Sequence, residues 1–258
     1  MNTTPHGEWA DCDIRLTLLG KELRGRVSVP TRAARTADLL PAVYSLADAV
    51  VDATTSLLGT EGKAASCRAG CAACCRWPVP VAGSETVHLA QCVDSMPPDR
   101  QQIVRRRFDD ALARLDRGHV LDKIAERMEA GRPAIGGELA AAYFALNVAC
   151  PFLEDERCSI YAHRPAVCRE HLVTSPPSRC GEAGQETERV LMLARVSPVL
   201  FRFQEGAVKE TARAVPLVLA LARAKSAAEE TARRLPGTQL FEAFIREFSA
   251  TQLGHEVP

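Results

Sequence analysis

Four cysteines within nine positions constrain this chain more than any other feature of its sequence. They are spaced Cys67-x3-Cys71-x2-Cys74-Cys75, in the stretch SCRAGCAACC. If the stretch were helical, the four sulfurs would share one stripe of the helix. If it were a loop, Cys71 and Cys74 would form the usual chelating pair of a metal site. Gly70 favours the loop, because glycine weakens a helix interior. Both geometries bring the thiols together, so the stretch predicts metal binding.

A second group of cysteines follows later, at Cys150, Cys158, Cys168 and Cys180. We interpret the two groups as halves of one site, with Cys180 a candidate eighth member. Pro165 is expected to begin a helical turn that leaves Cys168 near a helix N-terminus, where free N–H groups favour a thiolate. The remaining two cysteines, Cys12 and Cys92, fit ordinary buried thiols, and a Cys92→Ser change is predicted to be silent.

Other side chains near the cysteines are candidates for supporting roles. His163 and His171 are adjacent to the predicted ligands, and imidazole is a common zinc ligand, although the surplus of cysteines makes neither necessary. Arg76, Arg164 and Arg169 flank cysteines, and each either offsets thiolate charge or is an ordinary surface arginine. The adjacent Cys74 and Cys75 point to opposite faces of extended backbone, so one of them is expected to bridge to a second metal or to stay free.

Composition excludes several classes of function. The chain has 258 residues with 32 basic and 32 acidic side chains. Because these charges balance, the protein has no overall positive electrostatic field that would attract a nucleic acid. No apolar run approaches the ~20 residues that a membrane span needs, and no secretory signal is visible. We therefore expect a cytoplasmic protein without a membrane or nucleic-acid partner. A protein partner is an open alternative. In a reducing compartment, clustered cysteines favour metal or redox chemistry over disulfides.

The expected fold class is mainly α with an N-terminal β-hairpin and an irregular, metal-organised centre built from two cysteine-rich loops. Residues 13–29 alternate apolar and polar side chains around Gly20-Lys21, which indicates the hairpin. The predicted organisation is a hairpin segment (1–35), a cysteine cluster domain (36–185) and a C-terminal helical segment (186–258) packed on that domain.

Helical spacing and breaker residues predict the individual helices. The first helix is expected at 36–58. An insert spanning 84–147 is expected to contain four helices, at 84–95, 98–117, 119–130 and 137–147. Helix is expected again over 186–252, with interruptions at Pro198, Pro216 and Pro236-Gly237. Ser84 is predicted to be an N-cap residue.

The ordered cysteine pattern resembles the bacterial YkgJ-type cysteine cluster proteins, a zinc- or iron-chelating family. The resemblance covers about residues 67–180 and includes Cys150-Pro151-Phe152-Leu153, Cys158-Ser159-Ile160-Tyr161 and Arg164-Pro165-x2-Cys168-Arg169. It implies zinc or an iron-sulfur cluster held by Cys67, Cys71, Cys74, Cys75, Cys150, Cys158 and Cys168. One branch of the family is similar to flagellin lysine N-methylase, which implies protein methylation as an alternative.

Three functions remain after the sequence is considered. The first is a protein that holds an iron-sulfur cluster, of which [4Fe-4S] is one form, or zinc. The second is an enzyme that resembles a protein-lysine N-methylase and uses the cluster, and the third is a zinc-stabilised structural or interaction protein. We favour the iron-sulfur cluster, because the adjacent pair and the surplus of thiols suit a polynuclear centre. No catalytic residue can be assigned, since no nucleophile motif or phosphate-binding loop is present.

Overall fold

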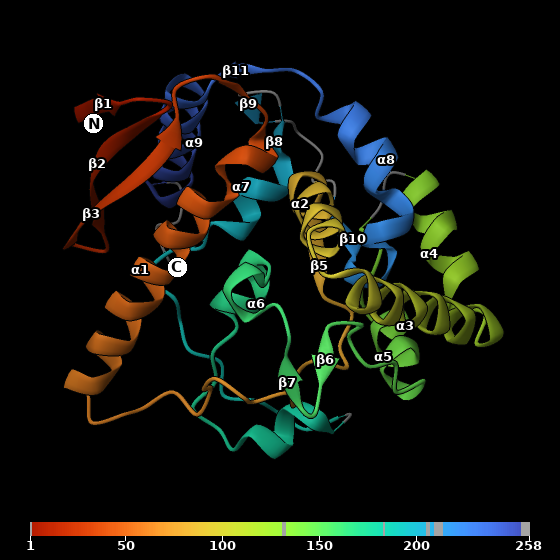
Figure 1. Cartoon of the computed structure of the whole chain (residues 1–258). Coiled ribbons are helices and arrows are strands. Elements are labelled where there is room, and N and C mark those ends of the chain that lie inside the picture. Colours follow the sequence, from red (N-terminus) through yellow and green to blue (C-terminus); the bar gives the residue numbers. More distant parts are fainter. Residues whose placement is uncertain (1, 131–132, 183, 205–206, 209–213, 254–258) are drawn as a thin grey trace.

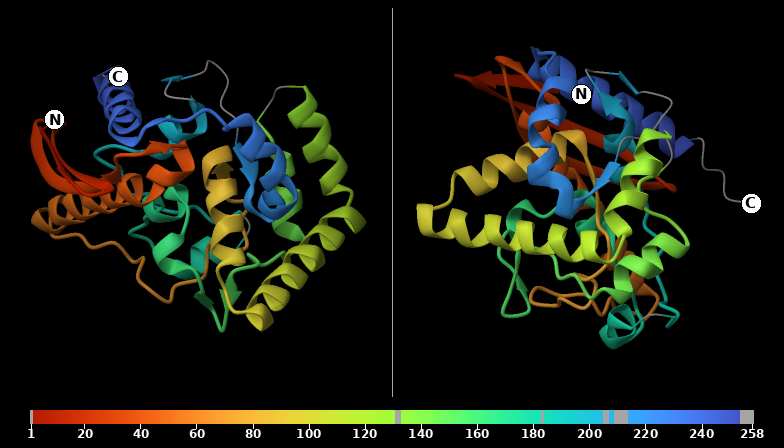
Figure 2. Two further views of the ribbon diagram at one scale, coloured as in Figure 1. Left: turned by 45° about the horizontal axis from the view of Figure 1, so that its top comes forward. Right: turned by 90° about the vertical axis from the view of Figure 1, so that its right-hand side faces the viewer.

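The structure is a computed structural model that describes residues 2–130, 133–182, 184–204, 207–208 and 214–253 (Figure 1). It is mainly helical with antiparallel strands at its N-terminus, which confirms the expected fold class. The N-terminal sheet lies at one end of the molecule and two helices of the insert lie at the other, with the cysteine-bearing loops between them (Figure 2).

The N-terminal element is a three-stranded antiparallel sheet, one strand more than the predicted hairpin. Its strands are β1 (Asn2–His6), β2 (Trp9–Leu18) and β3 (Lys21–Pro30), in the order β1-β2-β3. Every second residue of β2, from Ala10 to Leu18, is buried, as expected for a strand with one face on a core. The turn at Leu19 and Gly20 has positive φ at both residues, 46° and 75°, which is the pattern of a two-residue type I′ hairpin turn.

The largest core lies between this sheet and three helices, α1 (Leu40–Thr60), α7 (Ser197–Arg202) and α9 (Gly237–Leu253). A 3₁₀ turn at Thr36–Leu39 leads into α1, and Pro41 lies in the first turn of that helix, where its missing N–H costs little. α9 packs against β2 and β3. Gly237 begins α9 within van der Waals reach of the Pro30 backbone, because an added Cβ would lie 2.1 Å from the Pro30 carbonyl oxygen.

The insert between the two cysteine groups forms the predicted helices with small shifts of their ends. These helices are α2 (Gly83–Asp94), α3 (Pro98–Arg117), α4 (Val120–Glu129) and α5 (Glu138–Ala145). Ser84 is not the N-cap of α2, because the helix begins one residue earlier and Ala82 takes that position. Glu85 instead accepts a hydrogen bond from the Ala82 N–H at 2.9 Å, which satisfies a free donor of the first turn.

The C-terminal region differs from the predicted helical pattern at its beginning. Residues 186–196 form no helix, and Val173 pairs with Arg189 in an antiparallel bridge. Pro198, Pro216 and Pro236 each lie at or directly before the start of a helix, so the helices are interrupted where this was predicted. The remaining elements are β10 (Ala214–Pro216), a 3₁₀ turn at Leu217–Leu219, α8 (Ala220–Glu230) and the short strands β4 (Ala33–Ala34), β5 (Pro80–Ala82), β8 (Phe203–Gln204), β9 (Ala207–Val208) and β11 (Leu235–Pro236).

Two of these strands connect the insert to the rest of the chain. β5 pairs with β10 in antiparallel register, and α2 packs along α8. α2 is therefore fixed from two sides, directly after the first cysteine group. None of the helices in the described ranges has the length and apolar character needed to cross a bilayer.

Candidate metal centre

The two cysteine-rich segments are joined directly through their backbones. The Cys150 N–H donates to the Cys75 carbonyl oxygen at 2.8 Å, and the Ser66 N–H donates to the Val173 carbonyl oxygen at 2.8 Å. The indole N–H of Trp77 donates to the Cys180 carbonyl oxygen at 2.7 Å. The first segment thus contacts the second at its beginning, middle and end, so the two groups of cysteines occupy one region of the molecule.

The first segment, residues 66–77, is a loop and not a helix. Gly70 has a φ of +87°, a conformation that favours glycine. Tight turns follow, in which the Cys71 N–H donates to the Arg68 carbonyl oxygen at 3.0 Å and the Cys75 N–H to the Ala72 carbonyl oxygen at 2.9 Å. The loop interpretation of the four cysteines is therefore the correct one.

The second segment places its cysteines on short elements. Cys158 lies in β7 (Arg157–Cys158), which pairs with β6 (Leu153–Glu154) in a small hairpin. Cys168 lies in α6 (Ala166–Glu170), which follows Pro165 as predicted. Cys180 is buried in a 3₁₀ turn at Pro177–Gly181.

Cys74 interacts electrostatically with cysteines of both segments. Five other cysteines have a raised pKa, mainly because they are buried. The charge of Cys74 raises the pKa of each of them further. These five cysteines are Cys67, Cys150, Cys158, Cys168 and Cys180. The charge of Cys71 likewise raises the pKa of Cys67 and of Cys180. A hydrogen bond between the Cys74 and Cys75 thiols is the main reason that the pKa of Cys74 is raised. All eight predicted cysteines therefore lie within electrostatic range of this group.

Burial dominates the titration of the second-segment thiols. It raises the pKa of Cys150 to about 12 and that of Cys168 well above its ordinary value. The expected stabilisation of a Cys168 thiolate by the start of α6 is outweighed, because desolvation disfavours the charged form. All ten cysteines are free thiols. Without a cation the Cys150 and Cys168 thiols are neutral near pH 7, and a bound metal would have to displace their protons.

Two arginines surround the thiols. Arg164 lies over the Tyr161 ring, with its guanidinium carbon 3.9 Å from the ring centre, and its charge lowers the pKa of Cys67, Cys74 and Cys158 against the effect of burial. The Nε of Arg164 is buried without a hydrogen-bond partner. Arg76 instead pairs with Glu156 at 2.8 Å, at the protein surface.

Arg169 is a buried structural residue and not a surface arginine. Its side chain is 5% exposed and contacts Asp48 of α1 at 2.6 Å. Its guanidinium also donates to the carbonyl oxygens of Arg164, at 2.9 Å, and Ala162. These bonds hold the segment before α6 against α1, so Arg169 orients the backbone that carries Cys168.

A buried carboxylate fixes α6 from the other side. Glu85 of α2 accepts hydrogen bonds from the Ala166 N–H at 2.8 Å and from the Tyr44 hydroxyl at 3.2 Å. Burial raises the pKa of Glu85 even though these bonds oppose that shift. Glu170, at the end of α6, accepts from the Ser197 hydroxyl at 2.6 Å. α6 is thus connected by hydrogen bonds to α2 and α7.

The two histidines near the cysteines have different surroundings. The thiol of Cys67 donates to the backbone carbonyl oxygen of His171 at 3.7 Å, and burial lowers the pKa of the His171 imidazole. His163 lies at the end of a 3₁₀ turn (Tyr161–His163) and is exposed. Its ring centre lies 5.4 Å from that of His88.

Cys92 is not the ordinary buried thiol expected from the sequence, for which a change to serine would be silent, because it is half-buried and lies beside two histidines. Its Sγ lies 3.6 Å from the Nε2 atom of His88, and the donor atoms of His88, Cys92 and His163 all lie within 4.8 Å of one another. Burial lowers the pKa of His88 to about 4. The signal available in the sequence was the four-residue spacing of His88 and Cys92, which puts both on one face of a helix.

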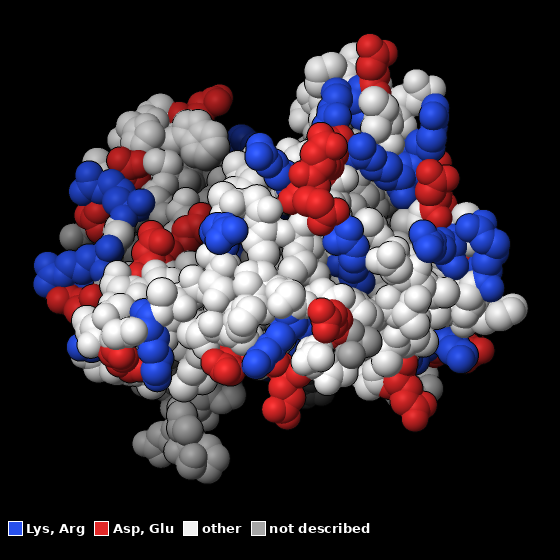
Figure 3. Space-filling model, turned by 90° about the horizontal axis from the view of Figure 1, so that it is seen from below, with Lys and Arg blue, Asp and Glu red and all other residues white. Residues whose placement is uncertain are grey.

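The donor set of the cysteine region fits a soft or borderline metal. Thiolates are the preferred ligands of zinc and of iron-sulfur clusters, and the unpartnered Arg164 Nε is a donor that a thiolate or sulfide would satisfy. Figure 3 views the face on which the cysteine-bearing loops lie, and most of the charged side chains gather around its uncharged central area.

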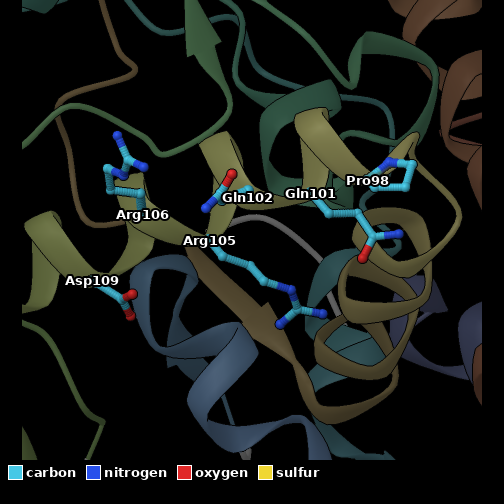
Figure 4. Close-up of a pocket in the computed structure, with 6 residues that line it drawn as sticks. All are labelled: Pro98, Gln101, Gln102, Arg105, Arg106 and Asp109. Carbon is cyan, nitrogen blue, oxygen red and sulfur yellow. The ribbon is translucent and has the colours of Figure 1, made fainter.

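A shallow hollow on α3 belongs to a different part of the molecule (Figure 4). It has a volume of about 430 Å³ and is lined by Pro98, Gln101, Gln102, Arg105, Arg106 and Asp109. Arg105 pairs with Asp94 of α2 at 2.5 Å. The lining contains no thiol or imidazole, so the hollow is not part of the candidate metal centre.

Comparison with known proteins identifies the cysteine-rich region. Residues 66–189 match the model of the CxxCxxCC family, described as a "putative zinc- or iron-chelating domain". The first segment has one residue more between Cys67 and Cys71 than the spacing in the family's name. No curated protein and no solved structure matches the chain at a significant level. The region that carries all eight predicted ligands is therefore similar to the CxxCxxCC family of domains.

Proposed function

We propose that the protein holds an iron-sulfur cluster through thiolates of the two cysteine-rich segments. The observation that carries this proposal is that hydrogen bonds join the two cysteine-rich segments, which together carry eight thiols including Cys74. Four thiolates are enough for one zinc ion or one [4Fe-4S] cluster. Eight are better explained by a polynuclear centre with bridging or spare ligands.

The metal-free arrangement of the cysteines differs from that of a mononuclear zinc site. A tetrahedral zinc ion with Zn–S bonds of about 2.3 Å brings its sulfur ligands to about 3.8 Å from one another. In the described part of the chain, the three-member group with donor atoms within 4.8 Å of one another is His88, Cys92 and His163, and it contains only one thiol. No three cysteine sulfurs of the described residues therefore meet the separation that mononuclear zinc requires.

The predicted ligands are Cys67, Cys71, Cys74, Cys75, Cys150, Cys158 and Cys168, with Cys180 as the eighth candidate. When bound, the cluster supplies a site for electron transfer or for binding of a small ligand. Arg164 would offset the negative charge of the thiolates, and Arg169 would hold the segment that carries Cys168. We further propose a reducing compartment such as the cytoplasm, because oxidation would pair these free thiols.

The test is metal analysis of the full chain purified without oxygen. Iron, acid-labile sulfide and zinc are measured together with the visible absorption spectrum. We expect iron and sulfide in near-equal amounts and broad absorption by thiolate-to-iron transitions. The matched control is Cys12→Ser, which removes a thiol from the core of β2, distant in sequence from both segments. The control should retain the metal content of the wild type.

A colourless protein with stoichiometric zinc and no sulfide would overturn the iron-sulfur proposal and favour the structural zinc alternative. A protein that takes up neither metal, although it is folded, would overturn metal binding by these cysteines altogether.

A further inference from the structure

A second group of metal-binding side chains lies outside the cysteine cluster. His88 and Cys92 are four residues apart on α2, and His163 reaches them from the 3₁₀ turn before α6. The donor atoms of the three side chains lie within 4.8 Å of one another. α2 and this turn are far apart in the sequence, so the convergence is produced by the fold.

We propose that His88, Cys92 and His163 form a mononuclear site for a divalent transition metal of the zinc class, separate from the cysteine cluster. Two imidazoles and one thiolate are a donor set for zinc and similar ions, whereas calcium and magnesium require oxygen ligands. The site goes beyond the proposed iron-sulfur function, because two of its three residues belong to neither cysteine segment.

The distances agree with the size of a zinc ion. Zinc bonds of about 2.05 Å to nitrogen and about 2.3 Å to sulfur, at a tetrahedral angle, place the two ligand atoms about 3.6 Å apart. The distance between His88 Nε2 and Cys92 Sγ is 3.6 Å. The pair therefore has the separation of two zinc ligands, and a small rotation of the exposed His163 would complete three of the four coordination positions.

Neighbouring side chains hold the ligands in place. The His88 ring lies edge-on to Tyr44, with the ring centres 5.8 Å apart, and the Tyr44 hydroxyl is bonded to the buried Glu85. The turn of His163 is closed by its own N–H, which donates to the Ile160 carbonyl oxygen at 2.7 Å. Because these contacts exist without a metal, binding requires little reorganisation.

The fourth coordination position would face solvent. His88 and Cys92 are half-buried, whereas His163 is exposed. Three protein ligands with one open position are typical of zinc sites that bind water or a substrate. The site would also connect α2 to the segment between Cys158 and Cys168, and so would link the insert to the second half of the cysteine cluster.

The experiment measures zinc bound by the full chain with its cluster in place. Wild type, Cys92→Ser and His163→Gln are equilibrated with Zn²⁺ and desalted, and zinc, iron and sulfide are quantified. His119→Asn is the matched control, because it removes an exposed imidazole at the start of α4. We expect each site variant to bind one zinc fewer than wild type and the control to bind the same amount, with iron and sulfide unchanged in all four proteins.

Two further measurements sharpen the result. Zinc affinity of the site should fall by at least about 100-fold in His163→Gln. Loss of an outer-shell partner already lowers metal affinity by up to about 100-fold, and His163 would contact the metal directly. With Co²⁺ as the probe, the wild type should show a thiolate-to-cobalt absorption that is absent from Cys92→Ser.

Equal zinc content in wild type and His163→Gln would overturn the site, and this variant decides the question even if Cys92→Ser folds poorly, because His163 is exposed. Loss of iron and sulfide in His163→Gln would also overturn it, since His163 would then be a ligand of the cluster. The difference between variants isolates this site whichever metal the cysteines hold, so its failure is distinguishable from failure of the proposed function.

Discussion

At the scale of single residues, the sequence predicts thiols far better than it predicts their surroundings. The first four cysteines stand out as candidate ligands from their spacing alone, because few other roles require four thiols in nine positions. The environment of Cys92 could not, since its partner His163 is on a distant segment. From the sequence, Arg169 could either offset thiolate charge or be an ordinary surface arginine. Its contacts with Asp48 and two carbonyl oxygens establish a buried structural role.

Cys71→Ser is expected to abolish metal retention and to lower the thermal stability of the full chain. Cys71 lies next to Gly70 in the first loop, and metal binding is coupled to the folding of such loops. The check is iron, sulfide and zinc content together with the melting temperature, with Cys12→Ser as the control for metal content. Wild-type values in Cys71→Ser would remove this residue from the ligand set.

Arg169→Leu should lower the free energy of unfolding by about 2–4 kcal/mol, because two carbonyl oxygens lose a charged donor. Asp48→Asn is the matched control. It should cost about 1 kcal/mol or less, because the Asp48 side chain is 48% exposed and its ion pair is screened. Urea unfolding of the two variants at equal metal content measures the difference. Equal costs would mean that the ion pair, and not the carbonyl contacts, is what Arg169 contributes.

At the scale of elements, helices bounded by proline and glycine were predicted well. α3 has the predicted limits, because Pro98 and Gly118 mark its ends. The segment 186–196 was wrongly predicted to be helical, because its contacts with distant residues outweigh helix propensity. Val190 and Met192 are 6% exposed whereas Leu191 is 81% exposed. That alternation is the pattern of extended backbone.

The β2–β3 turn offers a stabilising substitution. Leu19 has a φ of 46°, which costs a residue with a Cβ atom, and asparagine tolerates this conformation better. Leu19→Asn should therefore raise the free energy of unfolding by roughly 0.5–1 kcal/mol. Gly20→Ala should lower it by a similar amount, since Gly20 also has positive φ. Urea unfolding tests both, and a destabilised Leu19→Asn would show that the exposed leucine contributes packing.

At the scale of the whole molecule, the core and the candidate metal centre are built from different parts. The largest core unites β2, β3, α1, α7 and α9, and the candidate metal centre borders it through Cys67 and Ala166. The cysteines of the centre lie mainly in loops between elements. The helical class could be predicted, because it follows from local periodicity. The backbone hydrogen bond between Ser66 and Val173 could not be predicted, because it depends on how the elements pack.

Metal removal should therefore loosen one region and leave another intact. After chelation under reducing conditions, amide hydrogen exchange is expected to accelerate in residues 66–77 and 150–181. Exchange in β2 and β3 should change little, because their hydrogen bonds and packing do not involve the thiols. Uniform acceleration across the chain would show that the metal supports the entire fold. No acceleration anywhere would show that the loops are held by their backbone bonds alone.

The bond between the Cys150 N–H and the Cys75 carbonyl oxygen also bears on biosynthesis. It cannot form until the entire insert has been translated, and at about 5–20 residues per second the intervening chain takes roughly 4–15 s to synthesise. During that interval the first four thiols leave the ribosome without their partners. Completion of the metal centre is accordingly a late step, and the nascent chain depends on the reducing capacity of its surroundings to keep Cys74 and Cys75 from oxidising before Cys150 arrives.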